Sequence, residues 1–221
     1  MCGRMALTLP MDAMAQLFAA VPDNDLPGVP NYNVCPTTQV PVVTGGEDGG
    51  RRLRSMRWGL IPHWYRKPGD GPLLINARGE TIAEKPAFRA AVRERRGLVL
   101  ASGFYEWTKD DEGGRDPWYI TRADGAPMAM ASVWQDWTDP EGARLTTCAV
   151  VTIGANAAMS RLHHRMPVIL EPGDWPLWLG EEGKGAATLL RPGAEGALRW
   201  HRVSRAVNSN RAEGPGLVEP V

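Results

Sequence analysis

The distribution of apolar and polar residues along the chain is dominated by short apolar runs of strand length. The 25 glycines and 19 prolines are spread over the 221 residues and separate these runs, a pattern that favours many short elements joined by turns. Glycine-rich segments at 44–50 and 110–116 lie between such runs and predict two mobile hairpin tips. The predicted strands are 40–43, 52–58, 97–103, 103–109, 117–121, 126–134, 145–152, 166–170 and 198–204.

Apolar residues at helical spacing are confined to a few segments. The clearest is 10–20, where an apolar stripe follows a proline. Part of 79–96 is predicted to be helical, with an interruption near Pro86 because proline breaks the hydrogen bonding of a helix interior. The segments 154–162 and 172–180 each predict one short helix.

Residues 1–221 are predicted to form one domain, since the sequence shows neither an internal repeat nor a linker. Many short strands with few helices indicate an α+β fold. We expect a mostly antiparallel sheet that curls into a barrel-like form, with a few short helices at its flanks. We further expect the protein to be a monomer.

The charged residues of the sequence neither predict nor exclude binding to nucleic acid. The chain has 25 Lys and Arg against 25 Asp and Glu, so it lacks the basic excess that attracts nucleic acid over long range. Two arginine clusters, at 51–57 and 89–96, stand out locally. We predict that both are solvated faces balanced by nearby acids, although a local basic groove is compatible with zero net charge.

Cysteine usage points to a reducing compartment, because three cysteines cannot form a disulfide framework. Neither the cysteines nor the four histidines show paired zinc-ligand spacing, so we expect no metal and no other cofactor. No apolar run has the length of a membrane span or the form of a secretory signal. We therefore expect a cytoplasmic protein, and we predict that Cys35 and Cys148 are buried and inert.

Cys2 is the most unusual candidate for chemistry, since a structural residue is hard to anchor at a chain end. A small residue at the second position predicts removal of Met1, which would leave an α-amine and a thiol on one residue. Both groups titrate near pH 8, at about 8 and about 8.5. Such a 1,2-aminothiol condenses with an aldehyde to an imine, which the thiol closes to a five-membered thiazolidine. The alternative is a small buried residue.

Three further segments carry polar residues in strand-like or strand-end positions. Glu106 lies in the apolar, aromatic "ASGFYEW", where burial would raise its pKa into the range of proton transfer, unless it simply points outward. Asn76 and Arg78 in "LLINARGE" suit hydrogen bonding to a substrate and to phosphate, or turn and cap chemistry. His163 lies in "RLHHRMPVIL", a cluster before a strand, where functional loops are common.

Tryptophan is abundant, and core packing is the default for most of the nine residues. Trp64 and Trp107 lie beside polar, loop-like segments, where an indole ring could stack on a nucleobase.

Taken together, these motifs resemble those of the SRAP family, named as SOS response-associated peptidases. The resemblance runs from Cys2 to about Asn208, and it rests on unrelated motifs that occur in the order typical of that family. These motifs are "MCGR" (1–4), "NYNVCPT" (31–37), "RWGLIPHW" (57–64), "INARGET" (75–81), "GFYEW" (103–107), "LHHRMPVIL" (162–170) and "VSRAVN" (203–208).

The resemblance implies a protein that binds single-stranded DNA and traps abasic sites, in the DNA damage response. Cys2, once Met1 is removed, would form a thiazolidine with the aldehyde of the ring-opened sugar. Glu106 would shuttle protons, and Asn76 would hold the sugar or the N-terminal amine. His163 would assist ring opening and reversal of the crosslink, although His164 could share that role.

The same resemblance implies a set of DNA contacts and leaves two rival functions. A thiol peptidase would use Cys2 as nucleophile and His163 as base, with Asn76 orienting the site, and one form of it would cleave only its own Met1. A DNA-binding module would form no covalent bond. Bound to DNA, the protein would be associated with the nucleoid. The residues implied in DNA binding are Arg4, Asn33, Trp64, Arg78, Trp107 and Arg165.

Overall fold

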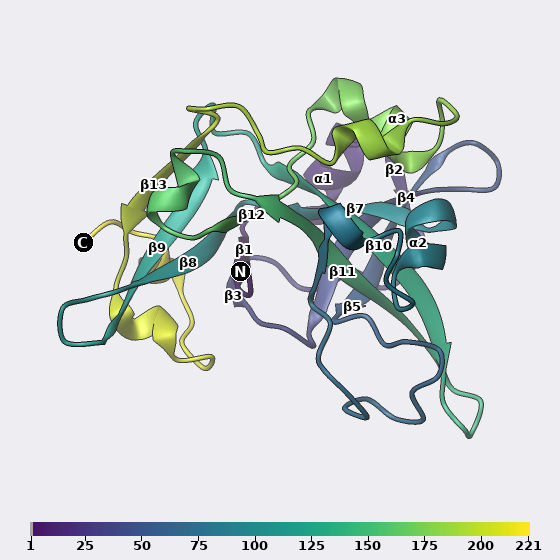
Figure 1. The fold of residues 1–221 in the computed structure, drawn as a ribbon, viewed down its shortest axis with the longest axis horizontal. Coiled ribbons are helices and arrows are strands. Elements are labelled where there is room, and N and C mark those ends of the chain that lie inside the picture. Colours follow the sequence, from purple (N-terminus) through teal and green to yellow (C-terminus); the bar gives the residue numbers. More distant parts are fainter. Residues whose placement is uncertain (1) are drawn as a thin grey trace.

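The computed structural model describes residues 2–221, and its main feature is a small closed barrel (Figure 1). Five strands pair in a ring, because the last of them, β5, pairs back with the first, β11. The β5–β11 pairing is parallel and the other four are antiparallel. The barrel strands are β11 (Arg144–Gly154), β10 (Met128–Thr138), β7 (Arg96–Ala101), β4 (Gln39–Gly45) and β5 (Arg51–Trp58).

Short strands extend the barrel, and a second sheet stands beside it. β6 (Asn76–Arg78) and β12 (Arg165–Pro167) pair with β11, and β2 (Ala20–Pro22) pairs with β5. The second sheet is antiparallel throughout. Its strands, in spatial order, are β13 (Leu198–Arg202), β9 (Arg115–Arg122), β8 (Gly103–Lys109), β1 (Met5–Leu7) and β3 (Asn31–Val34). The predicted α+β class and curled antiparallel sheet are therefore confirmed.

The chain passes from the barrel to the second sheet at Ser102. This residue separates β7 from β8 within one continuous apolar stretch. Its backbone N–H donates to the carbonyl of Ala6, and its hydroxyl oxygen accepts a hydrogen bond from the Thr8 backbone N–H at 2.9 Å. These bonds fix the N-terminal segment against the junction between the two sheets.

Helices are few and short, as predicted. The helix expected over 10–20 is α1 (Met11–Leu17), and the interruption expected near Pro86 separates η1 (Gly79–Thr81) from α2 (Arg89–Glu94). The segment 172–180 contains η3 (Pro172–Asp174) and α3 (Trp175–Leu179). The other 3-10 turns are η2 (Met159–Arg161), η4 (Ala186–Leu189), η5 (Arg205–Asn208) and η6 (Pro215–Leu217).

The helix expected over 154–162 is reduced to the single turn η2. Gly154 still belongs to β11, and the chain must return at Arg165 to start β12, which leaves little length between them. The Asn156 side chain accepts a hydrogen bond from the Met159 backbone N–H at 2.9 Å and begins the turn. A polar side chain that caps a turn in this way competes with a longer helix.

The core fills the barrel interior. On β5 the buried positions are Leu53, Met56 and Trp58, and Val42 of β4 and Val99 of β7 are buried beside them. Full burial of such a side chain contributes about 1.5–3 kcal/mol relative to exposure. Burial of these apolar residues therefore accounts for the closed arrangement.

The arginine clusters do not form an open basic surface. Arg51, Arg52 and Arg54 each pair with a carboxylate from another segment at 2.5–2.8 Å. In the second cluster Arg95 pairs with Glu94, and Arg96 donates to backbone carbonyls. The prediction that nearby acids balance these arginines is confirmed for Arg51, Arg52, Arg54 and Arg95, and it is wrong for Arg96, which is half-buried against backbone carbonyls.

The predictions for the two remaining cysteines have different outcomes. Cys148 is buried in the barrel core, as expected. Cys35 is only half-buried, because it follows β3 at the edge of the second sheet, and the prediction of burial is wrong there.

Within residues 2–221, no helix is both long and apolar enough to cross a membrane. The same residues contain no group of three His, Cys, Asp or Glu side chains placed to hold a metal ion.

Candidate functional site

The short strand β1 holds the N-terminal segment in the middle of the second sheet (Figure 1). Met5 pairs with Phe104 of β8, and the Tyr105 backbone N–H donates to the carbonyl of Arg4 at 3.0 Å. Hydrogen bonding to β8 on one side and β3 on the other prevents the fraying expected at a chain end. Cys2 is consequently buried, with 1% of its surface exposed.

Glu106 is buried on β8, with 2% of its surface exposed. Burial raises the pKa of its carboxyl, and the positive charges of His164 and Arg115 offset part of that rise. Burial and the neighbouring charge of Glu106 together raise the pKa of the Cys2 thiol. The prediction of a buried carboxyl with a raised pKa is confirmed, and the outward-pointing alternative is wrong.

Asn76 connects the barrel to the N-terminal segment. It lies on β6, paired with Val150 of β11, and its Nδ2 donates to the carbonyl oxygen of Cys2 at 2.9 Å. Its Oδ1 is buried and accepts no hydrogen bond from residues 2–221. Since a buried acceptor without a partner is costly, this oxygen is suited to accept a hydrogen bond from a substrate or from an amine.

His163 contacts the backbone of Arg165 through Nδ1. The Arg165 backbone N–H lies 3.0 Å from Nδ1 and the Arg165 carbonyl oxygen 3.3 Å from it, and the shorter contact, in which Nδ1 accepts, favours a neutral ring with its proton on Nε2. Burial lowers the pKa of His163, which favours the neutral form. The ring of His164 stacks on it with centroids 4.3 Å apart, and the charge of His163 lowers the pKa of His164.

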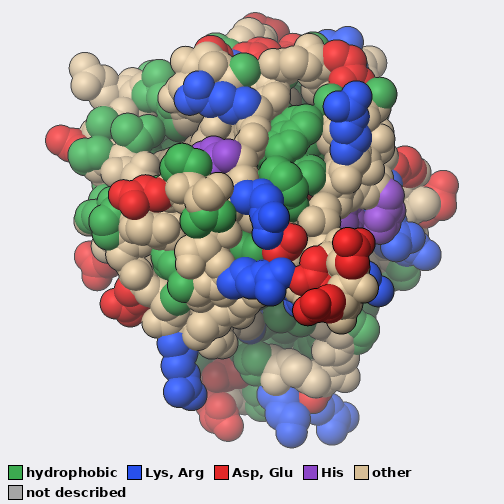
Figure 2. All heavy atoms as spheres, turned by 90° about the vertical axis from the view of Figure 1, so that its left-hand side faces the viewer, with side chains coloured by type: hydrophobic (Ala, Val, Ile, Leu, Met, Phe, Trp, Pro, Cys, Tyr) green, Lys and Arg blue, Asp and Glu red, His purple; other side chains and the backbone are tan. Residues whose placement is uncertain are grey.

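A cavity of about 790 Å³ brings several of the predicted residues together. It contains Glu106 and His163 but not His164, which favours His163 as the functional member of the pair. The lining residues are Gly3, Arg4, Glu106, Trp107, Thr108, Lys109, Gly113, Arg115, His163 and Asn208. Figure 2 shows the face of the molecule toward which the β8–β9 hairpin projects, where positive and negative side chains are interspersed.

Arg4 is positioned by the predicted motif residues around it. Its Nη1 donates to Oδ1 of Asn33 at 2.5 Å and to the carbonyl of Val207 at 3.0 Å. Its guanidinium carbon lies 5.8 Å from the ring centroid of Trp107, within range of a cation–π interaction. Trp107 in turn donates from Nε1 to Oδ1 of Asn208 at 2.6 Å. Asn33 is thus buried as a support for Arg4.

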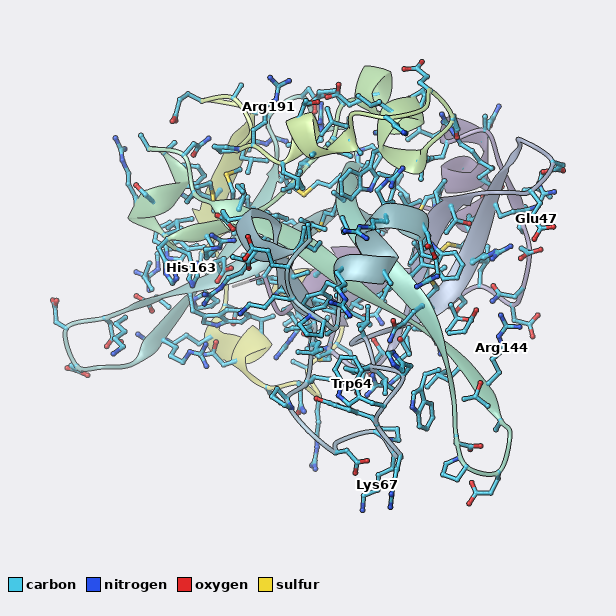
Figure 3. All side chains as sticks on the ribbon, turned by 45° about the vertical axis from the view of Figure 1, so that its right-hand side comes forward. Glu47, Trp64, Lys67, Arg144, His163 and Arg191 are labelled. Carbon is cyan, nitrogen blue, oxygen red and sulfur yellow. The ribbon has the colours of Figure 1, made fainter. Side chains whose placement is uncertain are left out.

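A second hollow, of about 410 Å³, lies on the other side of Asn76. Asn76, Arg78 and Trp64 all line it, and Trp64 is 50% exposed. Figure 3 shows Trp64 on the loop that carries Lys67, well separated from His163. Because Asn76 also contacts Cys2, the two hollows flank the N-terminal segment.

Among the predicted phosphate ligands, Arg165 pairs with a carboxylate of the described residues 2–221. Its Nη1 and Nη2 donate to the two oxygens of Glu80 at 2.6 and 2.8 Å, and Nη2 also donates to the Thr152 carbonyl. Hydrogen bonding to Arg165 lowers the pKa of Glu80 to about 2. This pair fixes the start of β12, and with it the backbone N–H that orients His163.

The sequence did not indicate three residues that line the first cavity: Lys109, Arg115 and Asn208. Asn208 is the last residue of the quoted motif "VSRAVN", and this motif could have indicated it as a residue of the site. Lys109 precedes the glycine-rich segment 110–116 and Arg115 lies within it, and the composition of this segment predicts only a mobile hairpin tip. Their place in the cavity depends on how the β8–β9 hairpin folds over the N-terminal segment.

Comparisons with known proteins agree with the fold and with the motifs. Residues 1–210 match the family described as SOS response associated peptidase (SRAP). The chain is 34% identical to the abasic site processing protein YoqW of Bacillus subtilis (strain 168), over 99% of both chains. It is 33% identical to the abasic site processing protein YedK of Escherichia coli (strain K12), over the full length of both.

A solved structure of a protein from Bacteroides thetaiotaomicron has the same fold, with a TM-score of 0.87 over 100% of both chains at 24% identity. The family match over residues 1–210 and the full-length relatives agree with each other. The chain therefore belongs to the SRAP family.

Proposed function

We propose that this protein processes abasic sites by binding single-stranded DNA and trapping the lesion covalently on Cys2 after removal of Met1. The observation that carries the proposal is that Cys2 is hydrogen-bonded to Asn76 and electrostatically coupled to Glu106, which lines a cavity together with Gly3 and His163. The names of the full-length relatives, which describe abasic site processing, support the same substrate.

The covalent step combines the aminothiol of Cys2 with the C1′ aldehyde of the ring-opened sugar. The amine adds to the aldehyde carbon, and the resulting carbinolamine loses water to give an iminium ion. The thiol sulfur then bonds to the iminium carbon, its proton is released, and a thiazolidine closes. The product is protein plus DNA less one water, with no change of oxidation state and no cofactor required.

Glu106 serves both proton transfers in this sequence. As a neutral acid it protonates the departing hydroxyl of the carbinolamine, and as the resulting carboxylate it takes the proton from the thiol. The raised pKa of Glu106 makes the first transfer feasible near neutrality. The raised pKa of the Cys2 thiol makes a base necessary for the second.

Asn76 positions the reacting groups, and His163 assists the opening of the sugar ring that precedes the covalent step. Asn76 holds the carbonyl of Cys2 through Nδ2 and presents the buried Oδ1 to the amine or to the sugar. His163 donates its Nε2 proton to the ring oxygen as the sugar opens, since its Nδ1 already accepts a hydrogen bond. The same group assists reversal of the crosslink by microscopic reversibility.

The DNA strand is held mainly by phosphate contacts and stacking. Arg4 and Arg78 line the two hollows that flank Cys2. Arg165 contributes less to phosphate binding, because Glu80 compensates its positive charge. Trp64 is exposed in the second hollow and is suited to stack on a base. Trp107 packs against arginine in the first hollow and shapes the wall there.

A general thiol peptidase is a weaker candidate. A cysteine nucleophile needs either a lowered thiol pKa or an adjacent general base. Burial and Glu106 raise the pKa of the Cys2 thiol, so a peptidase would depend wholly on a base such as His163. Peptide-bond cleavage restricted to the protein's own Met1 is compatible with the proposal, because it exposes the aminothiol.

The proposal is tested by denaturing electrophoresis of the protein incubated with a single-stranded oligonucleotide that carries one abasic site. Wild type and Cys35→Ser should form a denaturation-resistant adduct, whereas Cys2→Ser should not, because an oxazolidine is much less stable than a thiazolidine. Cys35 is the matched control, since it is a second cysteine outside the two hollows. An adduct that persists in Cys2→Ser would overturn the covalent mechanism.

A further inference from the structure

Cations near the site divide into those paired with carboxylates and those that are not. Arg165 pairs with Glu80, and Arg205 pairs with Asp110 and Asp116. Lys109 and Arg115, which line the main cavity, form no ion pair with any of residues 2–221. Both belong to exposed parts of the β8–β9 hairpin. Their charges therefore remain available to an outside partner.

The register of the hairpin places these two cations side by side. Lys109 of β8 pairs directly with Arg115 of β9. Side chains at directly opposed positions lie about 4.5–5.5 Å apart at Cβ, and like charges there destabilise the sheet. The direct pairing of two cations disfavours the sheet at this position, so a ligand that compensates both charges would account for it. An anion placed between the two side chains has the required charge.

The position of Arg115 connects this cation pair to the reacting groups. Its guanidinium carbon lies 5.3 Å from the ring centroid of Trp107, and its charge lowers the pKa of Glu106. Asn208 fixes the neighbouring backbone, because its Nδ2 donates to the Arg115 carbonyl at 3.1 Å. A phosphate bound at Lys109 and Arg115 would therefore lie along the wall of the cavity that contains Glu106.

The acidic residues of the hairpin turn confine such a phosphate to the last strand pair before the turn, Lys109 and Arg115. Asp110 is compensated by Arg205, and its side chain also accepts backbone N–H groups of the turn. Asp111 and Glu112 are exposed at the tip and would repel a phosphate there. Positive charge at this last pair and negative charge in the turn direct a DNA strand across the pair on the side away from the turn.

We propose that Lys109 and Arg115 form a phosphate-binding site for the DNA strand that enters the cavity next to the abasic residue. This inference rests on the DNA binding in the proposed function, but not on its covalent step. It adds a hairpin contact to the contacts of Arg4 and Arg78.

The test measures noncovalent binding of a single-stranded oligonucleotide with one tetrahydrofuran residue, an abasic analogue that has no aldehyde and cannot crosslink. Affinity is measured by fluorescence anisotropy from 50 to 200 mM salt for wild type and for Lys109→Gln/Arg115→Gln. Each phosphate contact on a single strand contributes about 0.7 to the slope of log affinity against log salt. Loss of two contacts should make the slope less steep by about 1.4, so the affinity difference from wild type shrinks about sevenfold over this range.

The matched control is Lys184→Gln/Arg191→Gln, which removes the same charge from exposed positions outside the main cavity. Figure 3 shows Arg191 at the opposite end of the molecule from Trp64. The control should keep the wild-type slope. The hairpin variant should unfold at the wild-type temperature or above it, because the substitutions remove a like-charge pair.

The outcomes separate this inference from the proposed function. A reduced slope in the hairpin variant alone, with wild type forming an adduct on a true abasic site, supports both. An unchanged slope in the hairpin variant overturns the phosphate site even if wild type crosslinks. A reduced slope without any wild-type adduct supports the phosphate site and overturns the covalent mechanism.

Discussion

Replacement of Glu106 by glutamine should separate the chemical role of this residue from its effect on stability. Glutamine has nearly the same shape as glutamic acid but cannot transfer a proton. General acid–base catalysis typically contributes about 10²–10⁴-fold to a rate. We therefore expect Glu106→Gln to slow crosslinking by at least about 10²-fold, with the affinity for tetrahydrofuran DNA unchanged.

The same substitution should raise stability at neutral pH. Burial raises the pKa of Glu106 in the folded protein, so between its unfolded pKa, about 4.3, and its folded pKa the folded state binds more protons. Stability from this group is thus present below about pH 4.3 and is lost as pH rises through the folded pKa. One proton corresponds to at most about 1.4 kcal/mol per pH unit, and glutamine removes this dependence.

The assays are single-turnover crosslinking at pH 7 and urea unfolding of both proteins from pH 4 to pH 8. The stability difference between Glu106→Gln and wild type should be smallest at pH 4 and grow with pH until it reaches a plateau. A crosslinking rate equal to that of wild type would refute proton transfer by Glu106. A stability difference that does not vary with pH would refute the assignment of a raised pKa.

Other substitutions test the supporting residues. Asn76→Ala should slow crosslinking while leaving the salt slope of DNA binding unchanged, because it removes the bond to Cys2 but no charge; an unchanged rate would contradict a positioning role. Arg78→Gln should flatten the salt slope by about 0.7, and Arg165→Gln by less, since its charge is compensated by Glu80; equal effects would contradict that compensation. Glu80→Gln should cost at most about 1 kcal/mol of stability at pH 7, and the cost should vanish on acidification through the lowered pKa of about 2; a cost that persists there would contradict the pairing.

Much of the fold follows from local patterns in the sequence. Alternating apolar runs and glycine-rich tips identify the long strands, since side-chain burial on one face has period two. The apolar stretch that contains Ser102 shows the limit of such patterns, because its division between two sheets depends on a hydrogen bond donated to the Ala6 carbonyl and one accepted from the Thr8 backbone N–H. β1 is too short to give a pattern of its own, and its partners on both sides create it.

The candidate site was predictable as a set of residue types and not as a set of contacts. The chemistry of an N-terminal cysteine indicates Cys2 without any structure. Its contact with Asn76, 74 positions away, and the pairing of Arg165 with Glu80, 85 positions away, depend on tertiary structure. The Lys109 and Arg115 pair arises from hairpin register, which the sequence of the tip left open.

The central claim is tested most directly by intact mass spectrometry of the purified protein, before and after incubation with a single-stranded oligonucleotide that carries one abasic site. The account predicts a protein mass that lacks Met1 and a product equal to protein plus DNA less one water, with the adduct on the N-terminal peptide that begins at Cys2. A protein that lacks Met1 and yields no such product would contradict the covalent trap.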